Sequence, residues 1–349
     1  MRIKAIAETF LLAALGGILF FLLHIPLAWM LGPLTAVVIW THVFTKSVYW
    51  PIKLRDGALI FLGYVIGSAF TANAARQIVA QLPVMLIVTL VILGMSLLLG
   101  YVTHRQTGIT LSTSLMGSVP GGFSQMVLMS EEIDDADVSV VSFMHTVRLL
   151  SVVFVVPYLA TQASGIGSPS SSANRVADFG LFFTPIPDAA LLILCVTLAT
   201  ALLAYRLRWP TPFLLGSITG TALIAMTGIP CPPLPPWLTI ASQIAVGAYM
   251  GSGILLANLA NWRSLLTYTL LGVAFVLAAS LATGYLLSSY YGYSNVTSFL
   301  SMAPGGIAEM SVTGIALQAD LSVIASYQIF RLFFMMMLTP LMFRYWLKN

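Results

Sequence analysis

Two arginines within apolar stretches are the residues best suited to bind a charged ligand. Arg148 follows Asp137 by eleven residues, and Arg331 follows Asp320 at the same spacing. An arginine near the centre of a membrane helix costs about 2.5–3.5 kcal/mol on insertion scales, so each should face the protein interior or a polar cavity. There a guanidinium can bind an anion, a carboxylate above all. The competing interpretation is structural, with each arginine bonded to an acidic side chain or to nearby backbone carbonyls.

A Pro-Gly-Gly sequence precedes each arginine inside an apolar segment. The first spans residues 120–122 and the second residues 304–306. Proline interrupts helix hydrogen bonding and glycine permits close approach, so amides and carbonyls become available to a ligand or an ion. A packing kink is the alternative, since Gly and Pro are frequent in membrane helices. Recurrence at equivalent positions favours a functional role.

The predicted substrate site combines these two elements with the polar residues that flank them. Glu309 stands where the first copy has Gln125, so the two copies are not equivalent and one could handle a proton or a cation. Asp137 and Asp320 stand at expected helix starts and should cap those helices, or else form ion pairs. The predicted substrate-binding residues are Pro120, Gly121, Gly122, Ser124, Gln125, His145, Arg148, Pro304, Gly305, Gly306, Glu309, Gln328 and Arg331.

Other chemistries lack the residues they need. The four histidines are dispersed without an i,i+4 pair, so no metal site is predicted. No nucleophile triad, phosphate loop or dinucleotide fingerprint occurs, so we expect neither an enzyme nor a bound cofactor. The net charge of +4 comes from scattered basic residues, which excludes a nucleic-acid patch.

The composition is that of a polytopic membrane protein. The 349 residues are 59% hydrophobic and only 7% charged, with a mean hydropathy of +0.96. Soluble domains carry roughly 25% charged residues. The expected partners are therefore the lipid bilayer and a small-molecule substrate of unknown identity. Assembly into a homo-oligomer is left open.

The chain is a tandem duplication. Sliding it on itself by 184 residues, and by 183 after a one-residue slip, aligns Pro, Gly, Asp and Arg in order, which chance apolar similarity would not do. We assign residues 1–161 to a first membrane repeat, 162–186 to a polar linker and 187–349 to a second membrane repeat. Aligned pairs include Pro26 with Pro210, Gly63 with Gly247, Gly67 with Gly251, Pro120 with Pro304, Asp137 with Asp320, and Arg148 with Arg331.

Each repeat contains six apolar segments. Basic residues bias towards the cytoplasm, and their distribution is reversed between the halves, so the repeats should be inserted with inverted topology. Inverted repeats need an odd number of crossings in each repeat, so one of the six segments must fail to cross the membrane. The fifth segment, broken by Pro-Gly-Gly, is the one able to turn back. We expect an all-α fold of about ten transmembrane helices plus two broken or re-entrant segments, with both termini cytoplasmic. The segments are 8–23, 28–44, 57–73, 81–103, 109–130, 137–160, 189–204, 211–227, 238–257, 265–289, 295–314 and 320–342.

Glycines at a four-residue spacing recur in the third segment of each repeat. Gly63 and Gly67 match Gly247 and Gly251. Small residues at this spacing let membrane helices approach closely. We expect them to serve helix packing rather than ligand binding.

The two copies of Pro-Gly-Gly followed by Ala-Asp and Arg resemble the AbrB-type duplicated membrane protein family of bacteria. The resemblance covers nearly the whole chain and implies a multi-pass protein of the bacterial inner membrane. Family members carry the labels regulator of gene expression and ammonia monooxygenase, and no site residue is carried over from them.

Three functions follow in order of preference. Inverted repeats, broken elements and paired arginines favour a secondary transporter of a small, carboxylate-bearing anion, coupled to protons or another ion. The alternative is a membrane-embedded regulator of gene expression that acts through a partner. A membrane monooxygenase is least favoured, because the metal ligands it needs are missing.

Overall fold

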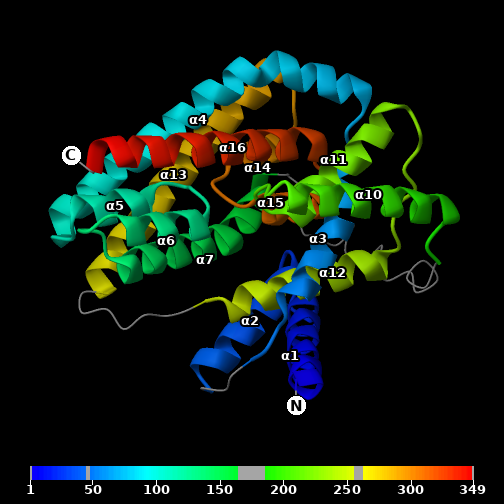
Figure 1. The fold of residues 1–349 in the computed structure, drawn as a ribbon, viewed down its shortest axis with the longest axis horizontal. Coiled ribbons are helices and arrows are strands. Elements are labelled where there is room, and N and C mark those ends of the chain that lie inside the picture. The colour runs from blue at the N-terminus through cyan, green and yellow to red at the C-terminus, as the bar shows by residue number, and fades with distance from the viewer. Residues whose placement is uncertain (1, 45–47, 164–184, 255–261, 348–349) are drawn as a thin grey trace. The chain divides into compact units, whose positions relative to one another are not determined.

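The computed structural model describes residues 2–44, 48–163, 185–254 and 262–347, and all regular structure in these ranges is helical (Figure 1). Most of the predicted linker, residues 164–184, lies outside the described residues. The helices before it are α1 (Arg2–Leu22), α2 (Ala28–His42), α3 (Ile52–Gly67), α4 (Ala72–Thr107), α5 (Leu111–Ser118), α6 (Phe123–Glu132) and α7 (Val138–Ala163). Those after it are α10 (Asp188–Arg206), α11 (Pro212–Met226), α12 (Pro236–Ser252), α13 (Trp262–Tyr291), α14 (Asn295–Met302), α15 (Ile307–Ala316) and α16 (Leu321–Leu347).

Every predicted apolar segment contains a helix, and the break at each Pro-Gly-Gly sequence is confirmed. The fifth segment of the first repeat divides into α5 and α6, and its copy divides into α14 and α15. Proline alone does not break a helix in this fold, because Pro83 lies inside α4 and Pro157 inside α7.

Within the described residues, six helices are long and apolar enough to cross a bilayer, as expected for a membrane protein. They lie within α1, α4, α7, α10, α13 and α16. The helices α2, α3, α11 and α12 have 15–17 residues, which is shorter than the roughly 20 that a typical crossing needs. The expected ten crossings and the inverted topology therefore stay predictions.

The chain forms two compact units, and each draws on both sequence repeats. The first unit comprises Met1–Val79, Pro157–Ile254 and Ala308–Val323. The second comprises Ala80–Val156, Leu255–Ile307 and Ile324–Asn349.

Within the first unit, the repeats are interleaved through glycine contacts. A Cβ added at Gly63 of α3 would overlap the Cβ of Ser217 in α11, and one at Gly247 of α12 would overlap the carbonyl oxygen of Met30 in α2. At Gly67 an added Cβ would lie 2.7 Å from the carbonyl oxygen of Ile218. The expectation that these glycines serve helix packing is confirmed, and each helix pair joins one repeat to the other.

Within the second unit, a hydrophobic core holds the first broken segment in place. It contains Met116 of α5 and Met126 of α6 together with Met335 and Phe343 of α16. The long helix α13 packs against α14, because a Cβ at Gly284 would lie only 3.0 Å from the Cα of Phe299. The short helices α5, α6 and α14 therefore each pack against a longer helix.

The first broken segment turns back on itself at Pro-Gly-Gly. Thr110, which caps the start of α5, donates through Oγ1 to the carbonyl of Asp135 beyond the end of α6, at 2.6 Å. The Asp137 N–H donates to Thr113 Oγ1 of α5 at 2.8 Å. A continuous helix over residues 110–135 would instead separate these groups by about 37 Å. The two ends of the segment therefore lie together and the turn lies at the far end.

Candidate functional site

The two Pro-Gly-Gly turns have the same backbone hydrogen bonds. After α5, the Val119 N–H bonds to Leu115 O and the Gly121 N–H to Val119 O, at 3.1 and 2.8 Å. After α14, Ala303 and Gly305 make the equivalent bonds, both at 2.8 Å. Breaking the helix at this point leaves its last carbonyls without helical partners and exposes the negative end of its dipole. Each turn therefore presents a group of carbonyls that have no partner within their own helix and that attract a positively charged donor.

Arg331 and Gln328 of α16 satisfy the carbonyls at the end of α14. Arg331 donates from Nη1 to Met302 O at 3.1 Å and from Nη2 to Gly305 O at 2.9 Å. Gln328 donates through Nε2 to Leu300 O at 2.8 Å and to Ala303 O at 3.1 Å. The Gln328 Oε1 accepts a further bond from Arg331 Nη2, which fixes the guanidinium from its side.

Arg148 and His145 of α7 do the same at the end of α5. Arg148 Nη1 donates to Val119 O at 2.8 Å, and His145 Nε2 lies 3.0 Å from Met116 O. The other histidine nitrogen, Nδ1, lies 2.7 Å from Arg148 Nη2. A guanidinium only donates, so Nδ1 must accept and Nε2 must carry the proton that bonds Met116. His145 therefore fits this site as a neutral ring and has the hydrogen-bonding pattern of Gln328.

No carboxylate of the described residues neutralises the charge of either arginine. In the described part of the chain, carboxylates pair with Lys4 and Arg55, and neither Arg148 nor Arg331 has such a partner. Both arginines bind backbone carbonyls, as the competing interpretation expects. Arg148 donates one N–H to the Val119 carbonyl and one to His145 Nδ1, which leaves three of its five N–H groups for a ligand.

Asp137 and Asp320 cap the helices that carry the arginines. Asp137 Oδ1 accepts from the N–H groups of Ser139 and Val140 at 2.8 and 3.2 Å. Asp320 Oδ1 accepts from the N–H of Ser322 at 3.0 Å, and from the Ser322 hydroxyl at 2.6 Å. Each aspartate satisfies free amides at the first turn of its helix. This fixes where α7 and α16 begin, and so the height of each arginine along its helix.

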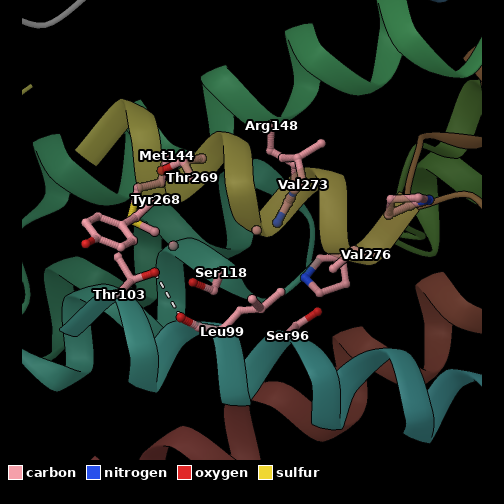
Figure 2. A pocket seen from close by; sticks show the side chains of 14 residues that line it. Ser96, Leu99, Thr103, Ser118, Met144, Arg148, Tyr268, Thr269, Val273 and Val276 are labelled. Atoms are coloured by element: carbon pink, nitrogen blue, oxygen red, sulfur yellow. Dashed lines mark hydrogen bonds between the residues drawn. The ribbon is translucent and has the colours of Figure 1, made fainter. Parts of the chain in front are cut away.

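A cavity in the second unit brings both turns and Arg148 together (Figure 2). Pro120 and Pro304 line it, as do side chains from α4, α5, α7 and α13. In Figure 2, Arg148 enters from α7, while Ser96, Leu99 and Thr103 project from α4. Its volume is ≈ 30 Å³, measured as space for the centres of water-sized molecules. About two or three water-sized groups fit, since one needs roughly 10–15 Å³ on this measure.

Thr269 of α13 is one of the polar cavity residues that sequence reasoning missed. Its side chain is 7% exposed, and its Oγ1 is buried without a hydrogen-bond partner. Ser96 and Thr103 were also missed. A signal existed for them, because Thr89, Ser96 and Thr103 recur every seven residues along the buried face of α4. Thr269 has no such pattern, and an isolated threonine in a membrane helix does not stand out.

Three further residues of the predicted site are Ser124, Gln125 and Glu309. Gln125 donates through Nε2 to Met336 O at 3.0 Å, and its Oε1 is buried without a partner. The Ser124 side chain lies outside the described ones. Glu309 belongs to the first compact unit, whereas Arg331 belongs to the second. The structure therefore brings together Pro120, Pro304 and Arg148 around this cavity.

Comparison with known proteins agrees with the resemblance drawn from the Pro-Gly-Gly motifs. Residues 29–347 match the family described as "Transition state regulatory protein AbrB". The chain is 29% identical over 355 residues to "Uncharacterized protein YhjN" of Bacillus subtilis (strain 168), covering 95% of this chain and 91% of the relative. It is 25% identical over 334 residues to "Putative regulator AbrB" of Escherichia coli (strain K12), covering 96% and 94%. This helical membrane protein belongs to the AbrB family.

Proposed function

We propose that the protein is a secondary transporter of a small, carboxylate-bearing anion and not an enzyme. The observation that carries the proposal is the position of Arg148, which lines a small cavity between the two Pro-Gly-Gly turns. Three of its N–H groups are left over from its bonds to Val119 and His145. A carboxylate accepts such donors strongly, and in bidentate fashion.

The surroundings of the arginine support transport over static binding. In many secondary transporters, broken helices from two inverted repeats meet at a site near the bilayer midplane. Here one turn comes from each sequence repeat, and a proline of each lines the same cavity. We place the protein in the bacterial inner membrane, with inverted repeats and cytoplasmic termini.

Glu309 is our candidate for coupling to a proton or another cation. It occupies the position of Gln125 in the other repeat, so the duplicated site carries an ionisable group on one side only. The Glu309 side chain is half-buried at the start of α15, with a Pro-Gly-Gly turn immediately before it. Ionisable residues in such places are often part of an ion pathway.

Binding of organic acids to the purified protein tests the proposal. We expect Arg148→Gln to weaken binding of the preferred anion by about 10- to 150-fold, as loss of a charged hydrogen bond worth about 1.5–3 kcal/mol implies. Arg263→Gln is the matched control, because Arg263 is exposed on α13 and does not line the cavity. The proposal fails if Arg148→Gln leaves the binding and uptake of every tested anion unchanged.

A membrane-embedded regulator acting through a partner is the second candidate. It is favoured by the description of the family and by the name of the Escherichia coli relative. Such a protein needs an output surface, and the linker is the longest polar stretch of the sequence. Deletion of residues 164–176 should abolish regulation while leaving anion binding intact if this candidate is right.

A further inference from the structure

We infer that the ligand of this cavity is a short-chain monocarboxylate and that the Thr269 hydroxyl is its second polar contact. The inference rests on the proposed function and narrows it, since it names a substrate class and a further binding residue.

The Thr269 hydroxyl is unusual among the hydroxyls of its helix. Thr267, Ser280 and Thr283 each donate to the carbonyl four residues earlier, at 2.8–2.9 Å. This is the usual way in which a Ser or Thr satisfies its hydroxyl inside a membrane helix. Thr269 makes no such bond, although its Oγ1 is buried. A buried hydroxyl without a partner costs free energy, and one that lines a cavity gains a partner when a ligand binds.

Thr269 and Arg148 line the same cavity from different helices. Arg148 comes from α7 and Thr269 from α13 (Figure 2). A guanidinium can bind one carboxylate oxygen or both, and a hydroxyl can donate to an oxygen that the arginine leaves accessible. Together they provide the donors that one carboxylate needs.

The charge of the cavity lining favours a monoanion. Among the described residues that line it, Arg148 is the one charged side chain, and the other polar groups are Ser, Thr and Tyr. Arg331 does not line it, and three of its N–H groups bind Met302, Gly305 and Gln328. A second carboxylate would be desolvated here without a cation of its own, which is costly.

The size and the apolar lining favour a short tail. The ≈ 30 Å³ of the cavity holds about two or three water-sized groups, which suits a carboxylate with one or two carbons beyond it. Apolar side chains of the lining would contact this tail, among them Leu99, Met144, Val273 and Val276.

The test measures the binding of acetate, propionate, succinate, citrate and inorganic phosphate to the purified full-length protein by ligand-induced thermal shift and calorimetry. The variants are Thr269→Val, which keeps the shape and removes the hydroxyl, and Arg148→Gln. Thr267→Val is the matched control, since Thr267 is exposed on the same helix and bonds to Arg263 O.

We expect acetate or propionate to bind more tightly than succinate, citrate or phosphate. Thr269→Val should weaken that binding about tenfold, while its melting temperature without ligand stays at or above that of the wild type, because an unpaired buried hydroxyl is removed. Thr267→Val should bind as the wild type does. A lower melting temperature of ligand-free Thr269→Val would mean that the hydroxyl has a structural partner, which overturns the inference.

The outcomes separate this inference from the proposed function. If succinate, citrate or phosphate binds best and Arg148→Gln abolishes that binding, the monocarboxylate inference is wrong and the anion transporter survives. If acetate binds and Thr269→Val binds it equally well, the role of Thr269 is refuted. If Arg148→Gln changes the binding of no anion, both the monocarboxylate inference and the proposed anion transporter are refuted.

Discussion

Replacing His145 distinguishes two roles for this residue. In the first it is a neutral hydrogen-bond relay, which links Arg148 to the Met116 carbonyl; in the second it carries a proton. In the structure His145 accepts from Arg148 at Nδ1 and donates to Met116 O at Nε2. Gln328 accepts from Arg331 and donates to Leu300 O in the other repeat. Glutamine at position 145 can therefore reproduce both bonds, whereas leucine can reproduce neither.

The magnitude follows from the burial of His145, which is 1% exposed. His145→Leu leaves the Met116 carbonyl unpaired, at about 1–3 kcal/mol, and removes an acceptor from a charged donor, at about 1.5–3 kcal/mol. We expect a loss of about 2.5–6 kcal/mol in the free energy of unfolding. At about 2 °C per kcal/mol, the low end for long chains, His145→Leu should melt about 5–12 °C below the wild type. His145→Gln should stay within about 1 kcal/mol of the wild type.

Thermal unfolding of the purified protein in one detergent checks these values. His104→Leu is the control, because His104 also bonds a carbonyl, that of Ile109, from a partly exposed position where water can replace it. Equal melting temperatures for the Gln and Leu variants at position 145 would refute the relay. So would a loss of the pH dependence of uptake in His145→Gln, because a relay that stays neutral carries no proton.

Three further changes test the fold and the second arginine. Gly63→Ala should destabilise the protein by about 1–3 kcal/mol because its Cβ would overlap Ser217, whereas Gly57→Ala, with open space on the same helix, should be neutral or stabilising by thermal unfolding. Asp137→Ala should lose about 1 kcal/mol through its helix cap and Asp137→Asn should lose less, as measured in the same assay. Arg331→Met should lose about 1–3 kcal/mol because the Gly305 carbonyl loses its donor, whereas Met302 O keeps the Ser280 hydroxyl, and Arg331→Lys should recover part of the loss; an unchanged melting temperature in Arg331→Met would contradict the bonds described.

Much of the fold could be predicted because its signals are local. Apolar segments, the Pro-Gly-Gly breaks and the aspartate caps each depend on residues close in sequence. The cost of an arginine in lipid was enough to place Arg148 against polar groups. The glycine spacing in α3 and α12 correctly indicated close helix packing.

The partners across the fold could not be predicted. No feature of the sequence tells which carbonyl Arg331 will bind, because Met302 and Gly305 become available only when α14 ends between them and the turn is formed. Thr269 contributes to the cavity through the position of α13, which depends on packing with distant segments. The equivalence of His145 and Gln328 was visible in the offset of the repeats, but its meaning needed the two bonds that each residue makes.

The exchange of partners between repeats affects how the protein is made. Gly63 of α3 packs on Ser217 of α11, 154 residues further along the chain. At roughly 5–20 residues per second, a ribosome completes that interval in about 8–30 s. During this time α3 is in place without the helix that covers Gly63 and Gly67. Neither repeat expressed alone should fold, and the two supplied as separate chains should rescue each other.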